Sequence, residues 1–337
     1  MADSIYTAPR ARAPRLAVFN HKGGVGKTTL TVNLSCAIAE LGLRVLLVDS
    51  DPQCNLTAYL VEETVVNDLL DNSDSANGST LWSALKPIVE GTGEPKFVQP
   101  IELPNGVALL AGDIRLAEYE AELPPFWGEC FQKRSRGFRG TTALSALINS
   151  IAISNNVDII MYDTGPNIGP LNRTILLDCD HFIIPAACDL FSLRAIKTLG
   201  HTLSAWITEW RTLQDLAPEN LYLLPGAPKL IGYVPQRFRV YASKPSLAYA
   251  ELLPRIEKSV KEDVVTVLER LGHDLVSCAK SPLRLTEIKD FGALANSAQQ
   301  QGVALWNANA GTPEQRADAR ACFMDFATNV LKRVGLQ

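Results

Sequence analysis

The stretch "FNHKGGVGKTTLTVNLSCAIAELG", residues 19 to 42, decides the fold of this 337-residue chain. A glycine-rich run ending in Gly-Lys-Thr-Thr lies between an apolar strand pattern at 16–20 and a segment in which Leu30, Leu34, Ile38 and Leu41 recur at helical spacing. Glycines let backbone N–H groups close around phosphate oxygens, and the helix N-terminus adds partial positive charge. The stretch therefore predicts a P-loop that binds nucleotide phosphates.

Residue types in this loop predict separate tasks. We expect Lys27 to contact the β- and γ-phosphates, Thr28 to ligate Mg²⁺ and Thr29 to contact the α-phosphate. The rest of the loop would bind phosphate mainly through its backbone: Gly23, Gly24, Val25 and Gly26. A glycine-rich turn without a ligand is the alternative, and the agreement of loop, strand and helix disfavours it.

Composition describes an ordinary globular chain with 47% hydrophobic and 20% charged residues. A net charge of -4 and a pI near 5.7 argue against a protein that coats nucleic acid with its whole surface, although they allow a local basic patch. The seven cysteines are scattered without a C-x-x-C pair, which indicates a reducing cytosol and argues against structural zinc or a ferredoxin-type cluster. No apolar run approaches the roughly 20 residues that span a bilayer.

The N-terminal segment "MADSIYTAPRARAPR" has no apolar core of a signal peptide, so we expect residues 1–15 to form a disordered basic tail of a cytoplasmic protein. From residue 16 onward, short apolar runs alternate with helical patterns, as in βαβ units. The expected strands are continuously apolar, which is typical of a parallel sheet covered on both faces; they lie at 16–20, 44–49, 107–112, 157–163, 181–186, 229–234 and 274–279.

These patterns predict a single α/β domain, 16–337, with a mostly parallel twisted sheet and helices on both faces. No composition shift marks a linker. Besides the tail, we expect two segments outside the core, the polar stretch 71–80 and an insert at 124–140. The insert carries a basic cluster next to aromatic residues, made of Lys133, Arg134, Arg136 and Arg139. It would suit DNA, RNA or an acidic partner, and a mobile solvated loop is the equal alternative.

Three carboxylates end predicted strands near the P-loop. Asp49 and Asp51 follow the strand at 44–49, and Asp163 ends the strand at 157–163. Ligands of open α/β sheets lie at this carboxyl edge, where a carboxylate can hold Mg²⁺ through water. Each acid could singly be a helix cap or a solvated strand end, but three together predict a nucleotide and metal site.

The chain resembles the ParA/Soj branch of the ParA/MinD family of deviant Walker A, SIMIBI-type P-loop ATPases. The likeness rests on five successive segments, from about residue 16 to the C-terminus: "KGGVGKTT", "VDSDPQCNLT", "YDTGPNIGPLNRTIL", "FIIPAACDLFSLRAIKTL" and "RLTEIKDFG". It departs from the family's "DTPPS" at Gly165 and Asn167, and Ala279-Lys280 replaces a common Ile-Pro, so no adenine pocket is assigned from the sequence.

The resemblance implies roles for individual residues. Lys22 matches the lysine that reaches across an ATP-sandwiched homodimer to the partner's phosphates, where a cation supplied in trans stabilises the transition state. In the free subunit we expect Lys22 and Lys27 to repel each other until ATP binds. Asp51 matches the residue that positions the attacking water, and Asp49 the acid near the metal shell. Thr28, Asp49 and Asp163 are the expected metal residues, and ATP and Mg²⁺ the expected cofactors.

The family's cycle implies slow ATP hydrolysis, non-specific DNA binding by the ATP dimer on the nucleoid, and release triggered by a ParB-like or adaptor protein encoded nearby. Its cargo would be plasmid or chromosome DNA. DNA binding requires cations on one face, and the candidates are Arg237, Arg239, Lys244, Lys332 and Arg333, with Lys258 and Lys261. Each also fits an ordinary solvated charge.

Alternatives remain at this stage. A MinD-like switch would bind a membrane or a protein through the amphipathic C-terminal segment. We expect that segment to pack on the sheet instead, since its polar face is poor in lysine. We likewise expect Trp206 and Trp210 in the core or at a dimer contact. A redox relative bridging a cluster would need suitably placed cysteines, and a metabolic ligase would have no evident use for Lys22 in trans.

Overall fold

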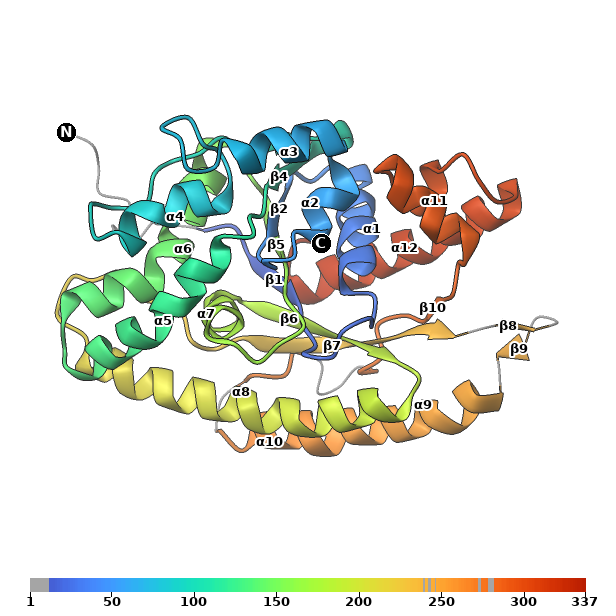
Figure 1. Cartoon of the computed structure of the whole chain (residues 1–337). Helices are drawn as coiled ribbons and strands as arrows, with labels where there is room; N and C mark the ends of the chain where they lie inside the picture. The colour runs from blue at the N-terminus through green and yellow to red at the C-terminus, as the bar shows by residue number, and fades with distance from the viewer. Residues whose placement is uncertain (1–11, 239, 242–243, 246, 272–273, 278–281) are drawn as a thin grey trace.

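The computed structural model describes residues 12–238, 240–241, 244–245, 247–271, 274–277 and 282–337 (Figure 1). Its central sheet has eight strands in the order β10-β7-β6-β1-β5-β2-β4-β3. All neighbouring pairs are parallel except β3 with β4. The strands are β1 (Arg15–Val18), β2 (Val45–Asp49), β3 (Ile101–Glu102), β4 (Val107–Leu110), β5 (Ile159–Asp163), β6 (His181–Ala187), β7 (Lys229–Phe238) and β10 (Ile288–Lys289).

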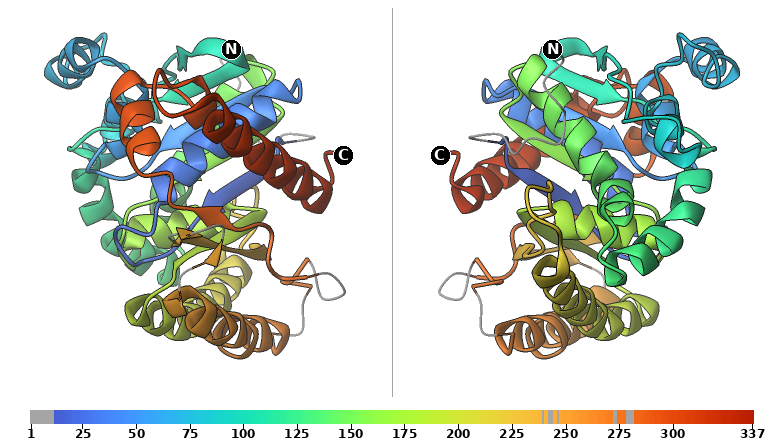
Figure 2. Two further views of the ribbon diagram at one scale, coloured as in Figure 1. Left: turned by 90° about the vertical axis from the view of Figure 1, so that its right-hand side faces the viewer. Right: turned by 90° about the vertical axis from the view of Figure 1, so that its left-hand side faces the viewer.

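Helices cover both faces of this sheet, as expected for buried parallel strands. Figure 2 shows α12 over one face and α6 over the other. The helices are α1 (Lys27–Glu40), α2 (Asn55–Leu60), α3 (Glu63–Asp71), α4 (Leu81–Val89), α5 (Leu116–Phe131), α6 (Ser135–Ser154), α7 (Pro170–Asp178), α8 (Leu190–Leu216), α9 (Leu247–Ser259), α10 (Thr266–Glu269), α11 (Ala293–Gln301) and α12 (Pro313–Val334). Short elements complete the fold: η1 (Pro104–Gly106), a two-stranded hairpin of β8 (Val240–Tyr241) and β9 (Lys244–Pro245), the π-helical η2 (Val260–Val265) and η3 (Leu305–Asn307).

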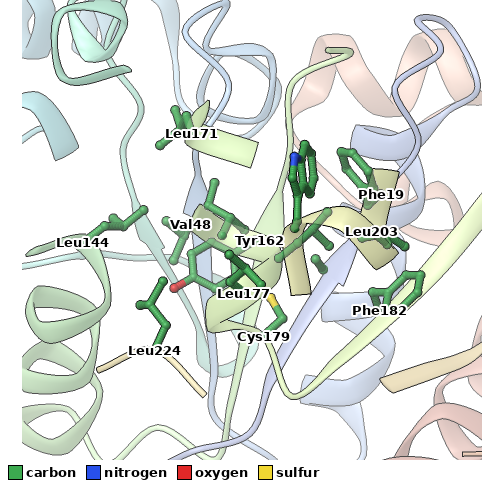
Figure 3. Packing of buried hydrophobic residues seen from close by; sticks show 14 of the residues in the cluster. Phe19, Val48, Leu144, Tyr162, Leu171, Leu177, Cys179, Phe182, Leu203 and Leu224 are labelled. Atoms are coloured by element: carbon green, nitrogen blue, oxygen red, sulfur yellow. The ribbon is translucent and has the colours of Figure 1, made fainter. Parts of the chain in front are cut away.

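The sheet separates two hydrophobic cores. Phe19, Tyr162 and Phe182 face the core beneath α5 to α8, and Figure 3 shows them with Leu177 and Cys179 of the same core. The opposite core is formed by α1, α12 and the alternate residues of the same strands. Because successive strand residues point to opposite faces, the continuously apolar runs fill both cores. The single α/β domain with a mostly parallel sheet is confirmed.

Six of the seven predicted runs each overlap one observed strand. In the seventh, 274–279, Val276 forms an isolated parallel bridge with Leu230. Residues 278–279 lie outside the described part of the chain.

The expected tail is wrong at its C-terminal end. Arg15 is the first residue of β1 and is fully buried, with its guanidinium paired to the buried carboxylate of Asp178. Arg12 also pairs with Asp178, at 3.2 Å, and with Asp180, at 2.7 Å. These ion pairs fix residues 12–15 on the domain, while residues 1–11 lie outside the described residues.

The expected insert at 124–140 is wrong as a non-core segment, because it forms the end of α5 and the start of α6. Phe126, Trp127 and Phe138 are buried. A Cβ atom on Gly140 would lie 2.4 Å from the ring of Phe126, so glycine is what lets the two helices meet. Of the basic cluster, Arg136 is paired with Glu129 at 2.5 Å.

The C-terminal segment packs on the sheet as expected. Helix α12 lies against α1, and its apolar stripe, Phe323, Phe326, Ala327, Val330 and Leu331, is buried. Trp206 and Trp210 are buried as well, the latter in edge-to-face contact with Trp127 at 5.1 Å. None of the helices formed by the described residues combines the length and apolar character that crossing a bilayer requires.

Candidate functional site

The glycine-rich loop connects β1 to α1 at the carboxyl edge of the sheet. Gly24 and Gly26 adopt φ angles of 70° and 82°, in the left-handed region that favours glycine. A Cβ atom on Gly26 would also lie 2.5 Å from the Gln236 Oε1 atom. The loop therefore has the curled backbone that directs N–H groups at an anion, as the P-loop pattern predicts.

Lys27 begins α1 and is 7% exposed. Its Nζ atom donates to the carbonyl oxygens of Asn20, at 3.0 Å, and Lys22, at 3.4 Å. Burial lowers the pKa of Lys27, although the carboxylates of Asp163 and Asp51 act in the opposite direction. The ammonium therefore rests on backbone oxygens at the place where phosphate oxygens would satisfy it better.

Thr28 and Asp163 meet at the end of β5. The Thr28 Oγ1 atom donates to Asp163 Oδ2 at 2.7 Å, and the buried Oδ1 atom has no hydrogen-bond partner among the described residues. Burial first, and then the charge of Asp49, raises the pKa of Asp163 to about 7. A buried carboxylate with a free oxygen beside a threonine hydroxyl matches the donor set that Mg²⁺ takes in P-loop sites.

Asp49 lies beside Asp163 in the sheet but points to α2. Its Oδ2 atom accepts hydrogen bonds from the Thr57 backbone N–H, at 2.8 Å, and hydroxyl, at 2.6 Å. Burial raises the pKa of Asp49 to about 6, although these two bonds lower it. In this state Asp49 fixes the first turns of α2 next to the cleft.

Asp51 follows β2 and lines the cleft above the P-loop. Its Oδ1 atom accepts the Gln53 N–H at 3.0 Å, which shapes the turn into α2. The cleft has a volume of about 480 Å³ and contains the P-loop, Asp51 and Pro166. Lys27, Thr28, Thr29 and Asp51 thus line one cleft, and Asp163 adjoins it through its hydrogen bond with Thr28.

A second cavity of about 360 Å³ continues from the P-loop past Gly26 and Thr29. It is bounded by Gln236 at the end of β7 and by residues 288–292. Gln236 is 3% exposed and its Nε2 atom has no partner among the described residues. Sequence reasoning missed Gln236, although a polar residue ending an apolar strand was the available signal.

Lys22 lies at the rim of the cleft, but the expected repulsion between Lys22 and Lys27 is wrong for the free subunit. The Lys22 Nζ atom is paired with the carboxylate of Asp189 and donates to Ser192 Oγ at 3.2 Å. Asp189 is the N-cap of α8 and accepts the Ser192 N–H at 2.8 Å. The charge of Lys22 is therefore neutralised within its own subunit.

The residues expected to contact DNA differ in how the structure places them. Arg333 donates to the carbonyl oxygens of Ile231, at 2.5 Å, and Pro282, at 2.8 Å, so it serves the fold. Lys332 is exposed. Arg239 and the side chains of Arg237 and Lys244 lie outside the described part of the structure.

A larger groove of about 510 Å³ lies between α8 and the α9–η2 segment, which run side by side in Figure 1. It is lined by four basic residues, Arg194, Lys197, Arg255 and Lys258, with Glu262 and Asp263 at one end. Among the described residues, only Lys258 of these four has an ion-pair partner, Glu262 at 3.9 Å. Sequence reasoning had included Lys258 and missed the other three, because they come from two helices about 60 residues apart.

Comparisons with known proteins agree with this geometry. A family profile described as an AAA domain matches residues 14–216. The chain is 33% identical over 194 residues to the sporulation initiation inhibitor protein Soj of Bacillus subtilis, spanning 56% of this chain and 64% of Soj. It is 30% identical over 282 residues to the chromosome partitioning protein ParA of Myxococcus xanthus, which covers 82% of this chain and 83% of that protein.

Among solved structures, protein DIP2308 of Corynebacterium diphtheriae superposes with a TM-score of 0.72 at 25% identity, over 95% of this chain and 98% of that one. The likeness therefore extends over the whole domain, beyond the phosphate-binding loop. The chain has a P-loop, an aspartate at the end of β5 (Asp163) bonded to the P-loop residue Thr28, and the lysine Lys22 before the first glycine of the loop. Together with these relatives, this shows that the chain belongs to the ParA/Soj branch of the ParA/MinD family of P-loop ATPases.

Proposed function

We propose that the protein is an ATPase whose ATP-bound form is a homodimer that binds DNA non-specifically. A partner protein stimulates the hydrolysis of ATP to ADP and phosphate. This cycle segregates or positions a cargo such as plasmid or chromosome DNA. The observation that carries the proposal is the convergence of Lys27, Thr28, Asp51 and Asp163 on one cleft. Cytoplasm and nucleoid are the proposed location.

Nucleotide binding is supported by the complementarity of the cleft and a triphosphate. Gly23, Gly24, Val25 and Gly26 would supply N–H groups, Lys27 a cation and Thr29 a hydroxyl. The adjoining cavity beside Gln236 would receive the base and ribose. The buried Nε2 atom of Gln236 has no hydrogen-bond partner among the described residues, so it could donate to an acceptor atom on the edge of the base.

Thr28 and Asp163 are the residues that would hold Mg²⁺, with Asp49 behind them. The free Asp163 Oδ1 atom and the raised pKa of its carboxyl both fit a group that a cation would stabilise. Bound there, the ion would neutralise charge on the β- and γ-phosphate oxygens. Asp51 would orient the attacking water from the opposite side of the cleft.

Dimerisation across the nucleotide is supported by what surrounds the cleft. Four large apolar residues with 46% to 70% exposure follow β4, β5 and β6 at the same sheet edge: Ile114 and Ile168 on loops, and Leu190 and Phe191 in the first turn of α8. A second copy facing this edge would bury them. Lys22 is at the same edge, from which it could reach the partner's phosphates.

DNA binding is supported by the groove between α8 and α9. Arg194, Lys197 and Arg255 have no acidic partner among the described residues, which leaves their charges available to phosphates. In this interpretation the groove replaces Arg333 as the main basic surface, and Lys332 remains a candidate. The activating protein, ParB-like or an adaptor, would bind the dimer once it is on DNA.

The testing experiment measures binding of a fluorescent 40-base-pair duplex with ADP, with ATP, and with ATP plus the Asp51→Ala variant, across a salt series. Salt-sensitive binding that requires ATP and persists in the variant supports the proposal. If ATP dimerises the protein but no nucleotide state binds DNA, the ATPase switch stands and the proposed DNA role is wrong. If ATP neither binds nor dimerises the protein, the whole proposal fails.

A further inference from the structure

The loop between β5 and α7, residues 164–169, closes one side of the nucleotide cleft. Pro166 lines the cleft and lies against the P-loop, since a Cβ atom on Gly23 would be 3.7 Å from Pro166 Cβ. Asn172, in the first turn of α7, holds the loop through its Nδ2 atom, which donates to Gly165 O at 3.0 Å and to Asn167 Oδ1 at 2.8 Å. Its position therefore decides the shape of the cleft beside the phosphates.

Helix α7 begins at this loop without a cap of its own. The N-cap residue is Gly169, which has no side chain to accept the first N–H groups. The carboxylate of Glu120, from the middle of α5, lies at that place and faces the Leu171 backbone N–H. A Cβ atom on Gly169 would lie 2.1 Å from Glu120 Oε1, so the carboxylate rests directly on the loop.

The opposite end of the loop approaches Asp51. A Cβ atom on Gly165 would lie 3.4 Å from Asp51 Oδ1. Glu120 is also close enough to Asp51 for the two charges to interact. Burial raises the pKa of Glu120, and so does the charge of Asp51, whereas the Leu171 N–H lowers it. The loop is thus held between two acids, Asp51 at its start and Glu120 at its end.

A second contact fixes α5 on α7. The guanidinium of Arg173 lies 3.8 Å from the centre of the Trp127 ring. Since Trp127 is two turns after Glu120 on α5, both contacts hold the same two helices in one register. A loop held between the central strand β5 and a helix fixed by its neighbour is an arrangement that keeps reacting groups within the small tolerances of phosphoryl transfer.

We propose that Glu120 is a positioning residue for ATP hydrolysis: it sets the start of α7 and thereby holds the 164–169 loop, with Pro166 and Gly165, against the P-loop and Asp51. The inference rests on the proposed ATPase function. Glu120 is not one of the residues that line the nucleotide cleft. It acts through the backbone of Gly169 and Leu171.

The test compares Glu120→Ala, Glu120→Gln and the control Glu122→Ala, a half-buried glutamate of the same helix with no hydrogen bond or ion pair among the described residues. Steady-state hydrolysis is measured in the full-length protein. We expect Glu120→Ala to lower kcat about 10- to 100-fold with KM for ATP changed less than about threefold, because the loop loses its anchor but the P-loop does not. Glu120→Gln keeps a side-chain oxygen at the start of α7, so it restores kcat to within about threefold of wild type.

Amide hydrogen exchange of residues 164–171 gives a second readout without hydrolysis. The proposal predicts faster exchange at Leu171 and in the loop for Glu120→Ala alone, in the absence of nucleotide. Unchanged kcat and unchanged exchange in Glu120→Ala overturn it, and so does a loss of kcat that Glu120→Gln fails to rescue. If wild type hydrolyses no ATP while exchange responds as predicted, the proposed function fails and the loop anchor stands.

Discussion

Lys22 and Asp189 form an ion pair that joins the P-loop to the first turn of α8, across 167 residues of sequence. The lysine proposed to act on the partner's phosphates is thereby held inside its own subunit. The pair is partly exposed, with 21% of the Lys22 and 42% of the Asp189 side chain accessible. Pairs of this kind contribute about 1 kcal/mol or less, so ATP and a second subunit can break it readily.

Asp189→Asn should therefore favour the dimer. Asparagine also caps helices well, so α8 keeps its start while Lys22 loses its counter-charge. Releasing about 0.5 to 1 kcal/mol should lower the ATP concentration for half-maximal dimerisation about two- to fivefold. Sedimentation velocity across an ATP titration measures it. A variant that needs more ATP than wild type would show that Asp189 assists Lys22 instead of holding it back.

Lys22→Ala should abolish ATP-dependent dimerisation and reduce hydrolysis by about 10²-fold or more, because a cation is missing where negative charge develops. The monomer should still bind ATP through Lys27. Lys197→Ala, which removes an exposed lysine from α8, is the matched control and should dimerise normally. Dimerisation and hydrolysis that survive Lys22→Ala unchanged would refute the sandwich arrangement.

The meeting of Thr28 and Asp163 could be predicted because it follows from local pattern. Thr28 and Asp163 lie 135 residues apart, yet each ends or follows an apolar strand, and parallel strands bring their carboxyl ends to one edge. No such rule connects Lys22 with Asp189 or Glu120 with Gly169. Those contacts depend on how α8 and α5 pack, which the sequence does not encode in its periodicity.

The α5–α6 region shows why the sequence pattern at 124–140 wrongly predicts a segment outside the core. Pro124 and Pro125 lie inside α5, and Gly137 lies inside α6, although proline and glycine usually mark a loop. Packing outweighs these local preferences, since Phe126 and Phe138 are fully or almost fully buried.

Charge reversal in the α8–α9 groove should weaken DNA binding. Arg255→Glu combined with Lys258→Glu removes two phosphate contacts per subunit, so the slope of log affinity against log salt should fall by about two for each subunit. ATP binding should stay unchanged, because the groove is separate from the nucleotide cleft. Lys332→Glu, at the end of α12, provides the comparison. If it lowers the slope and the double variant does not, DNA lies on α12.

Asp178→Asn should destabilise the fold far more than Asp180→Asn. Asp178 is 2% exposed and accepts hydrogen bonds from Tyr162 and Ser145 in addition to its pairs with Arg15 and Arg12, whereas Asp180 is half exposed. Removing one partner of a buried pair leaves the Arg15 guanidinium uncompensated, which costs about 3 to 5 kcal/mol, against about 1 kcal/mol or less for the outer pair. Urea unfolding of both variants at pH 7 measures the difference.

The same pair makes stability depend on acid. Burial alone would raise the pKa of Asp178, but the guanidinium groups of Arg15 and Arg12 hold this pKa below its usual range. A carboxyl whose pKa is depressed in the folded state stabilises the protein above its unfolded pKa of about 3.9, and this contribution is lost as pH falls through the folded pKa. Between pH 5 and pH 3 wild type should therefore lose more unfolding free energy than Asp178→Asn, which has no such carboxyl to protonate. Parallel losses in the two proteins would show that other carboxylates govern acid unfolding.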